Sequence, residues 1–267
     1  MIEQNVIIFA FGLTLLAGLS TGIGAFIAFF TKSTNKKMLS LSLGFSAGVM
    51  LYVSFVDIFP ASNRLLAHMG DFAQYATVLA FFSGIAIIMV IDRLVPSTHN
   101  PHQPRKVEDI KGGAKKSDGL MRIGVFVAIA IAIHNFPEGI ATFASFLVNM
   151  RVGIMIAVAV AIHNIPEGIS VSMPIYCATG NRRKAFYYSF LSGLSEPLGA
   201  LIGFALFAPF FSDAVVGALL AAVAGIMVFI SLDELIPAAI EYGNHHNFIY
   251  GVILGMAVMA LSIVLFL

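Results

Sequence analysis

The chemistry of this chain is concentrated in a six-residue pattern that occurs twice, each time inside an apolar stretch. The copies read HNFPEG at 134–139 and HNIPEG at 163–168. Each copy offers an imidazole nitrogen, an amide oxygen and a carboxylate, which suit zinc and other first-row divalent cations. A charged group in hydrocarbon is costly and usually marks a functional site. We therefore predict one metal site that both copies share, made of His134, Asn135, Glu138, His163, Asn164 and Glu167.

The spacing within each copy places its ligands on one helical face. At about 100° per residue, His134 and Glu138 are separated by about 40° around the helix axis. Pro137 lacks an amide N–H and clashes with the carbonyl group of Ile133, four residues earlier, and Pro166 repeats this effect in the second copy. Irregular helices at the middle of a membrane are tolerated where they line protein or a water-filled cavity. We therefore expect a kinked helix and a polar cavity beside the ligands.

The elements that position these residues are long apolar helices. The chain has 267 residues, of which 59% are hydrophobic and 11% charged, and its mean hydropathy is +0.93. Soluble domains carry roughly 25% charged residues, so we predict an all-α integral membrane protein. Runs long enough to cross a bilayer predict eight transmembrane helices in a single membrane domain spanning 1–267. They cover roughly 5–30, 38–60, 72–95, 120–148, 151–178, 185–211, 214–240 and 247–267.

The basic residues predict how these helices are oriented. With eight spans, thirteen of the fifteen basic residues lie on one side, and only Arg64 and Arg151 lie on the other. The positive-inside rule places the basic side in the cytoplasm, so both termini are expected outside. The segment 96–119 is rich in proline, glycine and charge and is predicted to be a flexible cytoplasmic loop between the third and fourth helices. Whether His99 and His102 in this loop bind metal stays open, as it does for His245 and His246.

Consecutive spans cross the membrane in opposite directions, so the two motif copies should be related by a pseudo-two-fold axis in the membrane plane. This inverted-repeat pattern is typical of secondary transporters, whose substrate lies at the repeat interface. Glu196, next to Pro197 on the sixth span, is a further buried acid, and no Lys or Arg lies in a span interior. Either the buried glutamates carry a proton or a mobile cation neutralises them, and both states fit a cation carrier. Asp57 could line the outer entrance.

At the other end of the pathway, Asp233 or Glu234 could line the inner exit. The single Cys177 excludes an internal disulfide framework and a cysteine zinc cluster. Small residues on the second and sixth spans, such as Gly48 and Gly199, are expected to allow close helix packing.

The paired motif and the eight spans resemble the ZIP family of divalent-metal transporters. The resemblance rests on IAIHNFPEGIATF at 131–143, AIHNIPEGISVSMP at 161–174, SEP at 195–197 and DELIP at 233–237. It implies a 3+2+3 arrangement, in which the fourth and fifth spans form the centre and two three-helix units flank it with inverted symmetry.

The resemblance also implies a binuclear centre. One sub-site would use His134, Glu138, His163 and Glu167. The other would use Asn135, Glu138, Asn164, Glu167 and Glu196, so that Glu138 and Glu167 bridge the two ions. Some family members have an acid where this chain has Asn164. The neutral amide gives the site of this chain less negative charge. Only two histidines lie in the 96–119 loop, in contrast to the histidine-rich loop of many eukaryotic members.

We therefore expect an uptake transporter, not an enzyme, that moves Zn²⁺ and also Fe²⁺, Mn²⁺ and Cd²⁺ into the cytoplasm as substrates, without a bound cofactor. Its expected location is the cell inner membrane. Its expected partners are divalent metal ions and the lipid bilayer, with no nucleic acid, and a homodimer is one assembly that the chain could form. The alternative is an intramembrane zinc-dependent hydrolase, but neither copy reads HExxH. A carrier of organic cations ranks third, because it would need an aromatic cage.

Overall fold

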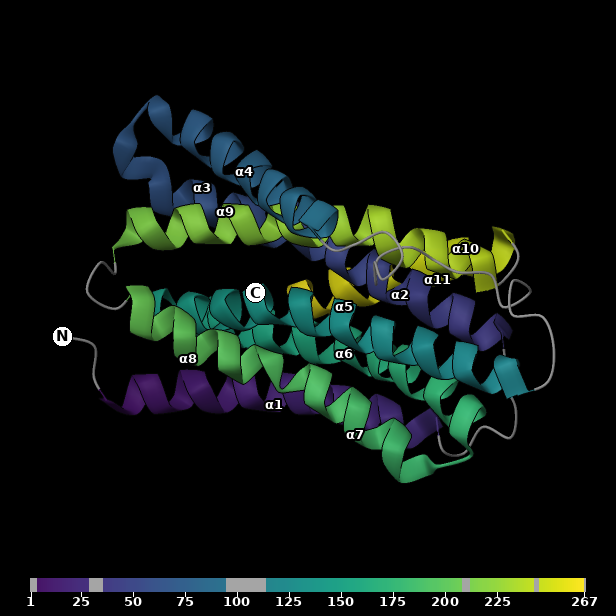
Figure 1. Ribbon diagram of the computed structural model, residues 1–267. Helices are drawn as coiled ribbons and strands as arrows, with labels where there is room; N and C mark the ends of the chain where they lie inside the picture. The colour runs from purple at the N-terminus through teal and green to yellow at the C-terminus, as the bar shows by residue number, and fades with distance from the viewer. Residues whose placement is uncertain (1–3, 29–35, 95–113, 208–211, 243–244, 267) are drawn as a thin grey trace.

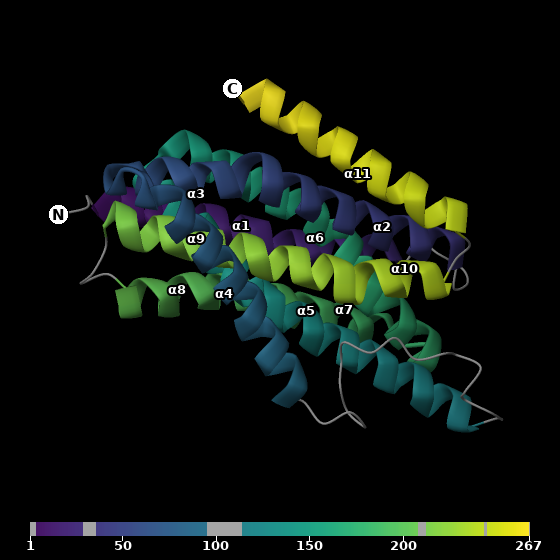
Figure 2. The same ribbon diagram turned by 90° about the horizontal axis from the view of Figure 1, so that it is seen from above.

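The fold is a bundle of long helices that run side by side (Figures 1 and 2). The computed structural model describes residues 4–28, 36–94, 114–207, 212–242 and 245–266, and these residues form helices joined by short turns, with no strand among them. The α-helices are α1 (Gln4–Ala28), α2 (Lys36–Val53), α3 (Phe59–Leu65), α4 (Phe72–Leu94), α5 (Ala114–Val148), α6 (Met150–Thr179), α7 (Arg182–Gly193), α8 (Ser195–Phe207), α9 (Asp213–Ile230), α10 (Ile236–Tyr242) and α11 (His245–Phe266). Short π-helical turns lie at η1 (Ser54–Ile58) and η5 (Ser231–Leu235), and a 3₁₀ turn, η2, covers Leu66–Met69.

The predicted all-α membrane fold is confirmed, because eight helices in the described part of the chain are long and apolar enough to cross a membrane. Three of these spans are composite. The second joins α2, η1, α3 and η2, the sixth joins α7 and α8 through Leu194, and the seventh joins α9, η5 and α10. The helix α5 starts at Ala114, before the predicted start at 120, so 114–119 is helical rather than loop. The rest of the predicted loop, with His99 and His102, lies outside the described residues.

The packing of the helices follows an inverted repeat. The central pair α5 and α6 is flanked by α8, which packs on α5, and by α1, which packs on α6. In the same way, α9 contacts α5 and packs along α4, while α2 contacts α6 and packs along α11. Each contact made by spans one to three therefore has an equivalent made by spans six to eight, which is the 3+2+3 arrangement. Figure 2 shows α11 and α4 on the outside of the bundle.

Two internal sequence repeats underlie this symmetry, and the sequence analysis missed both. The segment GLSTGIGAFI at 18–27 matches GLSEPLGALI at 193–202. The segment AGVMLYVSFVDIFP at 47–60 matches AGIMVFISLDELIP at 224–237, and both of these contain a π-helical turn followed by proline. An alignment of the chain with itself would have found them. Thr21 is thereby equivalent to Glu196, and Asp57 to Glu234.

Glycines bring the flanking helices into backbone contact with the central pair, as the packing prediction required. A Cβ atom on Gly139 of α5 would lie 1.9 Å from the carbonyl oxygen of Glu196 on α8. A Cβ atom on Gly168 of α6 would lie 1.9 Å from the carbonyl oxygen of Thr21 on α1. Only glycine permits these approaches, so the motif glycines fix the distance from the central pair to α1 and α8. Gly48 has the same function between α2 and α11, where a Cβ would lie 2.1 Å from the Val252 carbonyl oxygen.

Candidate metal centre

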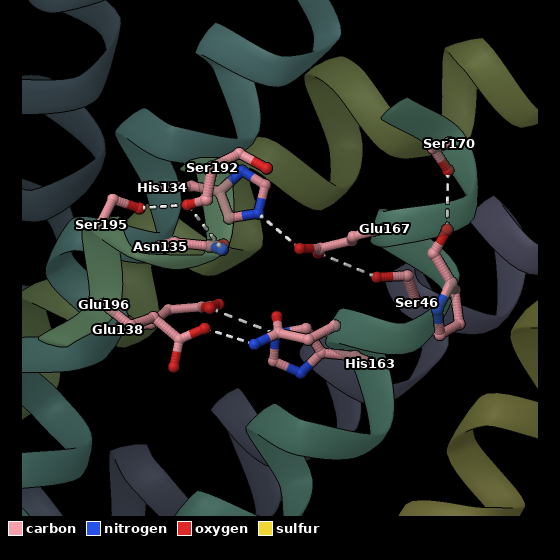
Figure 3. A network of polar contacts seen from close by, with 12 residues as sticks. Ser46, His134, Asn135, Glu138, His163, Glu167, Ser170, Ser192, Ser195 and Glu196 are labelled. Carbon is pink, nitrogen blue, oxygen red and sulfur yellow. Dashed lines mark hydrogen bonds and ion pairs between the residues drawn. The ribbon is translucent and has the colours of Figure 1, made fainter. Parts of the chain in front are cut away.

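The structure brings the seven predicted site residues together inside the bundle. Figure 3 labels His134, Asn135, Glu138, His163, Glu167 and Glu196 there. The six motif residues project from α5 and α6, and Glu196 joins them from the first turn of α8. Every one of the seven side chains is at most 1% exposed. Carboxylates and imidazoles are almost never buried this completely unless they are paired or bind a metal. Their contacts with one another therefore decide what the site can do.

The histidines and glutamates of the two motifs pair across the helices. His134 Nε2 lies 3.1 Å from Glu167 Oε2, and His163 Nε2 lies 3.2 Å from Glu138 Oε2. Two ligand atoms of a tetrahedral zinc ion, each about 2.0–2.1 Å from the metal, are about 3.3 Å apart. Both pairs therefore have the separation that two ligands of one zinc ion need.

Asn164 connects Glu196 to the same network by a hydrogen bond. Its amide nitrogen donates to Glu196 Oε1 and, at 3.0 Å, to the carbonyl oxygen of Ala17 on α1. The amide nitrogen of Asn135 lies 3.5 Å from the carbonyl oxygen of Ser192, which is the equivalent of Ala17 in the inverted repeat. Both amide groups thus direct their N–H groups to the flanking helices, and their oxygens remain available.

Several buried oxygen atoms of these residues have no hydrogen-bond partner. Among the described residues, five such buried oxygens belong to the predicted ligands: Asn135 Oδ1, Asn164 Oδ1, Glu138 Oε1, Glu167 Oε2 and Glu196 Oε2. A buried acceptor without a donor is costly, and a cation relieves that cost for several acceptors at once. Amide and carboxylate oxygens with imidazole nitrogens fit a borderline or hard divalent cation.

The ligands are not closed into a cage. No group of three or more His, Cys, Asp or Glu side chains in the described part of the chain already converges on one metal position. The histidines and glutamates are instead paired two by two, and none of the three glutamates is paired with Lys or Arg within the described residues. A metal ion would replace the proton between paired side chains after small side-chain rotations. Such a site exchanges its ion more easily than a rigid structural site.

One histidine is held by its own helix and the other is not. His163 Nδ1 lies 3.1 Å from the Ala159 carbonyl oxygen, where an N–H group donates, and this fixes the ring with Nε2 toward Glu138. Such a contact orients a ligating histidine. His134 Nδ1 has no hydrogen-bond partner among the described residues, although it occupies the same place in the first motif.

The two motif prolines do not end their helices, and the cavity beside Glu138 is lined mainly by apolar side chains. Both α5 and α6 continue as helices through Pro137 and Pro166. A small cavity does lie beside Glu138, but apolar side chains from η1, α5, α6, α9 and the end of α2 line the rest of it: Val53, Ile58, Ala141, Ile156, Ala159, Val160 and Met227. Flanking helices supply these residues, so the motif spacing alone did not reveal them.

Ser46 was missed by the sequence analysis, because a serine in an apolar span has no distinctive signature. Its hydroxyl on α2 donates to Glu167 Oε1 at 3.1 Å. Thr21, the repeat equivalent of Glu196, is also fully buried, and its hydroxyl has no hydrogen-bond partner within the described residues. An alignment of the chain with itself would have indicated Thr21, because it pairs this residue with Glu196.

Of the other predicted acids and histidines, Asp57 and Glu234 are buried, and His68 and His246 are exposed. Asp57 lies in η1, and Glu234 occupies the equivalent place in η5, where it is close enough to His134 to interact with it electrostatically. His68 is exposed, with Nδ1 2.9 Å from the Leu65 carbonyl oxygen. His246 is exposed at the start of α11.

Comparison with known proteins identifies the family. Residues 92–263 match the family model described as ZIP Zinc transporter. The chain is 60% identical to the zinc transporter ZupT of Streptococcus mutans, over 97% of each chain. It is 56% identical to ZupT of Clostridium perfringens, over 99% of this chain and 98% of that protein. It is 57% identical to ZupT of Nitratidesulfovibrio vulgaris, over the full length of both. With its eight apolar spans and its paired HNxPEG motifs, this integral multi-pass membrane protein belongs to the ZIP family.

Proposed function

We propose that the protein takes up divalent cations, principally Zn²⁺, through a binuclear site on α5, α6 and α8. Its relatives are named zinc transporters, and Fe²⁺, Mn²⁺ and Cd²⁺ are further proposed substrates. The observation that carries the proposal is the set of unpartnered, buried amide and carboxylate oxygens beside two crossed His–Glu pairs. No Lys or Arg among the described residues pairs with this set, so a cation in transit neutralises it.

One proposed sub-site holds an ion with the two His–Glu pairs. The second holds an ion with the oxygens of Asn135, Asn164 and Glu196. Glu138 and Glu167 bridge the two sub-sites, because each glutamate contacts a histidine through Oε2 and has a second oxygen for the neighbouring ion. Two divalent ions bring four positive charges to three carboxylates, so a doubly loaded site also needs little compensation from elsewhere.

Transport follows from an exchange of partners. An arriving ion loses water and takes the positions of the protons between His134 and Glu167 and between His163 and Glu138. When the ion leaves, the His–Glu pairs form again, so both the loaded and the empty states satisfy the buried charges. We propose that the helices move to open the site alternately to each side.

The setting of the transporter is also part of the proposal. We place the protein in the cell inner membrane with both termini outside, on the basis of the asymmetry of the basic residues. We also propose that it can form a homodimer. The intramembrane hydrolase is not favoured by any observation, because no catalytic HExxH pattern accompanies the site.

Uptake by reconstituted protein tests this function. Glu138→Ala and Glu167→Ala should each abolish zinc uptake into proteoliposomes, while the protein still inserts and folds. Glu241→Ala, which removes an exposed glutamate at the end of α10, is the matched control and should transport normally. Normal zinc uptake by either site variant would contradict the binuclear assignment, and cleavage of peptide or lipid would favour the hydrolase.

A further inference from the structure

The Ser46 hydroxyl is a contact to the proposed site from outside the central helices. Ser46 lies on α2, which packs along α11, and its side chain is fully buried. It donates to Glu167 Oε1 at 3.1 Å (Figure 3). The network around the motif residues is otherwise built by α1, α5, α6, α7 and α8. A side chain from α2 therefore contacts one of the two bridging glutamates.

This contact makes the hydrogen bonding of the two bridging glutamates different. Glu167 has a neighbour at each oxygen, Ser46 at Oε1 and His134 at Oε2. Glu138 contacts His163 through Oε2, whereas its Oε1 has no hydrogen-bond partner among the described residues. Each glutamate thus accepts one hydrogen bond, Glu167 from a hydroxyl on α2 and Glu138 from a histidine on α6, and Glu167 Oε2 additionally lies 3.1 Å from His134 Nε2.

The inverted repeat shows why the second glutamate lacks such a contact. Alignment of 47–60 with 224–237 places Gly48 opposite Gly225 and Ser54 opposite Ser231, and by the same shift it places Ser46 opposite Val223 on α9. Val223 is buried and has no hydrogen-bonding side chain. The repeat therefore supplies a donor for Glu167 and none for Glu138, although the two motifs themselves are almost identical.

We infer that Ser46 is a positioning residue for metal binding, which holds the Glu167 carboxylate in the orientation that its sub-site needs. The inference rests on the proposed function. Carboxylates that ligate metals are themselves hydrogen-bonded, and removal of such a partner typically weakens metal affinity about 10–100-fold. A hydroxyl that donates to Oε1 leaves the other lone pairs of the carboxylate free for the ion.

Zinc titration of the purified full-length protein tests the inference. Ser46→Ala should weaken the zinc Kd measured by calorimetry by about 10–100-fold. Ser46→Thr keeps the hydroxyl and should retain affinity within a few-fold. The matched control is Ser62→Ala, which removes another buried hydroxyl from the same span, one that donates to the Gly217 carbonyl oxygen at 2.6 Å. This control should leave the zinc Kd unchanged.

The possible outcomes distinguish a positioning role of Ser46 from an effect on folding, and from a failure of the proposed function. If Ser46→Ala lowers the Tm of the metal-free protein, Ser46→Val replaces it, because valine has the shape of threonine without the hydroxyl and should also weaken zinc binding. A zinc Kd of Ser46→Ala equal to that of the unchanged protein overturns the inference, as does equal weakening in Ser46→Thr. If Glu167→Ala also binds zinc normally, the proposed function itself fails.

Discussion

The contact between Gly139 and α8 gives the most demanding prediction. In Gly139→Ala, the new Cβ would lie 1.9 Å from the Glu196 carbonyl oxygen and 2.8 Å from its Cα atom. Real Cβ contacts are essentially never shorter than 3.0 Å, so α5 and α8 must separate by at least 1.1 Å, the difference between 3.0 and 1.9 Å. The obstacle is backbone, so rotation of a side chain cannot relieve it.

The displacement acts directly on the proposed site, because Glu196 is the residue that moves. Its hydrogen bond from Asn164 would be stretched by a comparable distance and weakened. Overpacking of this kind costs about 1–3 kcal/mol of folding stability. Misplacement of a reacting group by about 1 Å can cost about 100-fold in rate, and we expect a loss of that order in zinc uptake.

Thermal unfolding in detergent and zinc uptake in proteoliposomes measure the two effects. The control is Gly12→Ala on α1, because a Cβ at this position would meet no atom within 4 Å. It should retain the Tm and the uptake rate, since alanine favours helix over glycine. If Gly139→Ala transports within twofold of the unchanged protein at the same Tm, the close approach of α5 and α8 does not position Glu196.

Further predictions concern the repeat and the charge of the site. Gly168→Ala should lose uptake to a similar degree, because its Cβ would lie 1.9 Å from the Thr21 carbonyl oxygen; unimpaired uptake would contradict the inverted symmetry of the glycine contacts. Asn164→Asp brings a second carboxylate to Glu196 and should lower the Tm of the metal-free protein while enlarging the rise in Tm on zinc addition; an unchanged metal-free Tm would refute this. Zinc at 100 times its Kd should stabilise the unchanged protein by about 2.7 kcal/mol in thermal melts, and this gain should be lost in Glu167→Ala.

The sequence predicted the helices well and their interruptions poorly. Eight apolar runs are long enough to cross a bilayer, and hydrocarbon permits only helices or closed barrels there, so length and composition sufficed. The π-helical turns at Ser54–Ile58 and Ser231–Leu235 were not predicted, because one extra residue in a turn leaves no trace in hydropathy. The start of α5 at Ala114 was not predicted either.

The sequence by itself determined the proposed ligand set. Residue type and helical spacing put His134, Asn135 and Glu138 on one face, and the near-identical second copy implied a shared site. These are local properties, which depend on neighbours within five residues. The sequence also indicated that the buried glutamates need a proton or a cation, since no Lys or Arg lies in a span interior and a buried charge is costly whatever the packing.

Only the tertiary structure decided which side chains meet. His134 and Glu138 lie one turn apart on the same helix, yet His134 pairs with Glu167, and Glu138 pairs with His163, because two antiparallel helices cross at that height. The same packing brings Ser46 from α2 to Glu167 and leaves Glu138 Oε1 without a partner within the described residues. Near-identical motifs thereby acquire unequal surroundings, because hydrogen bonds between helices depend on their relative positions, which spacing along one helix does not specify.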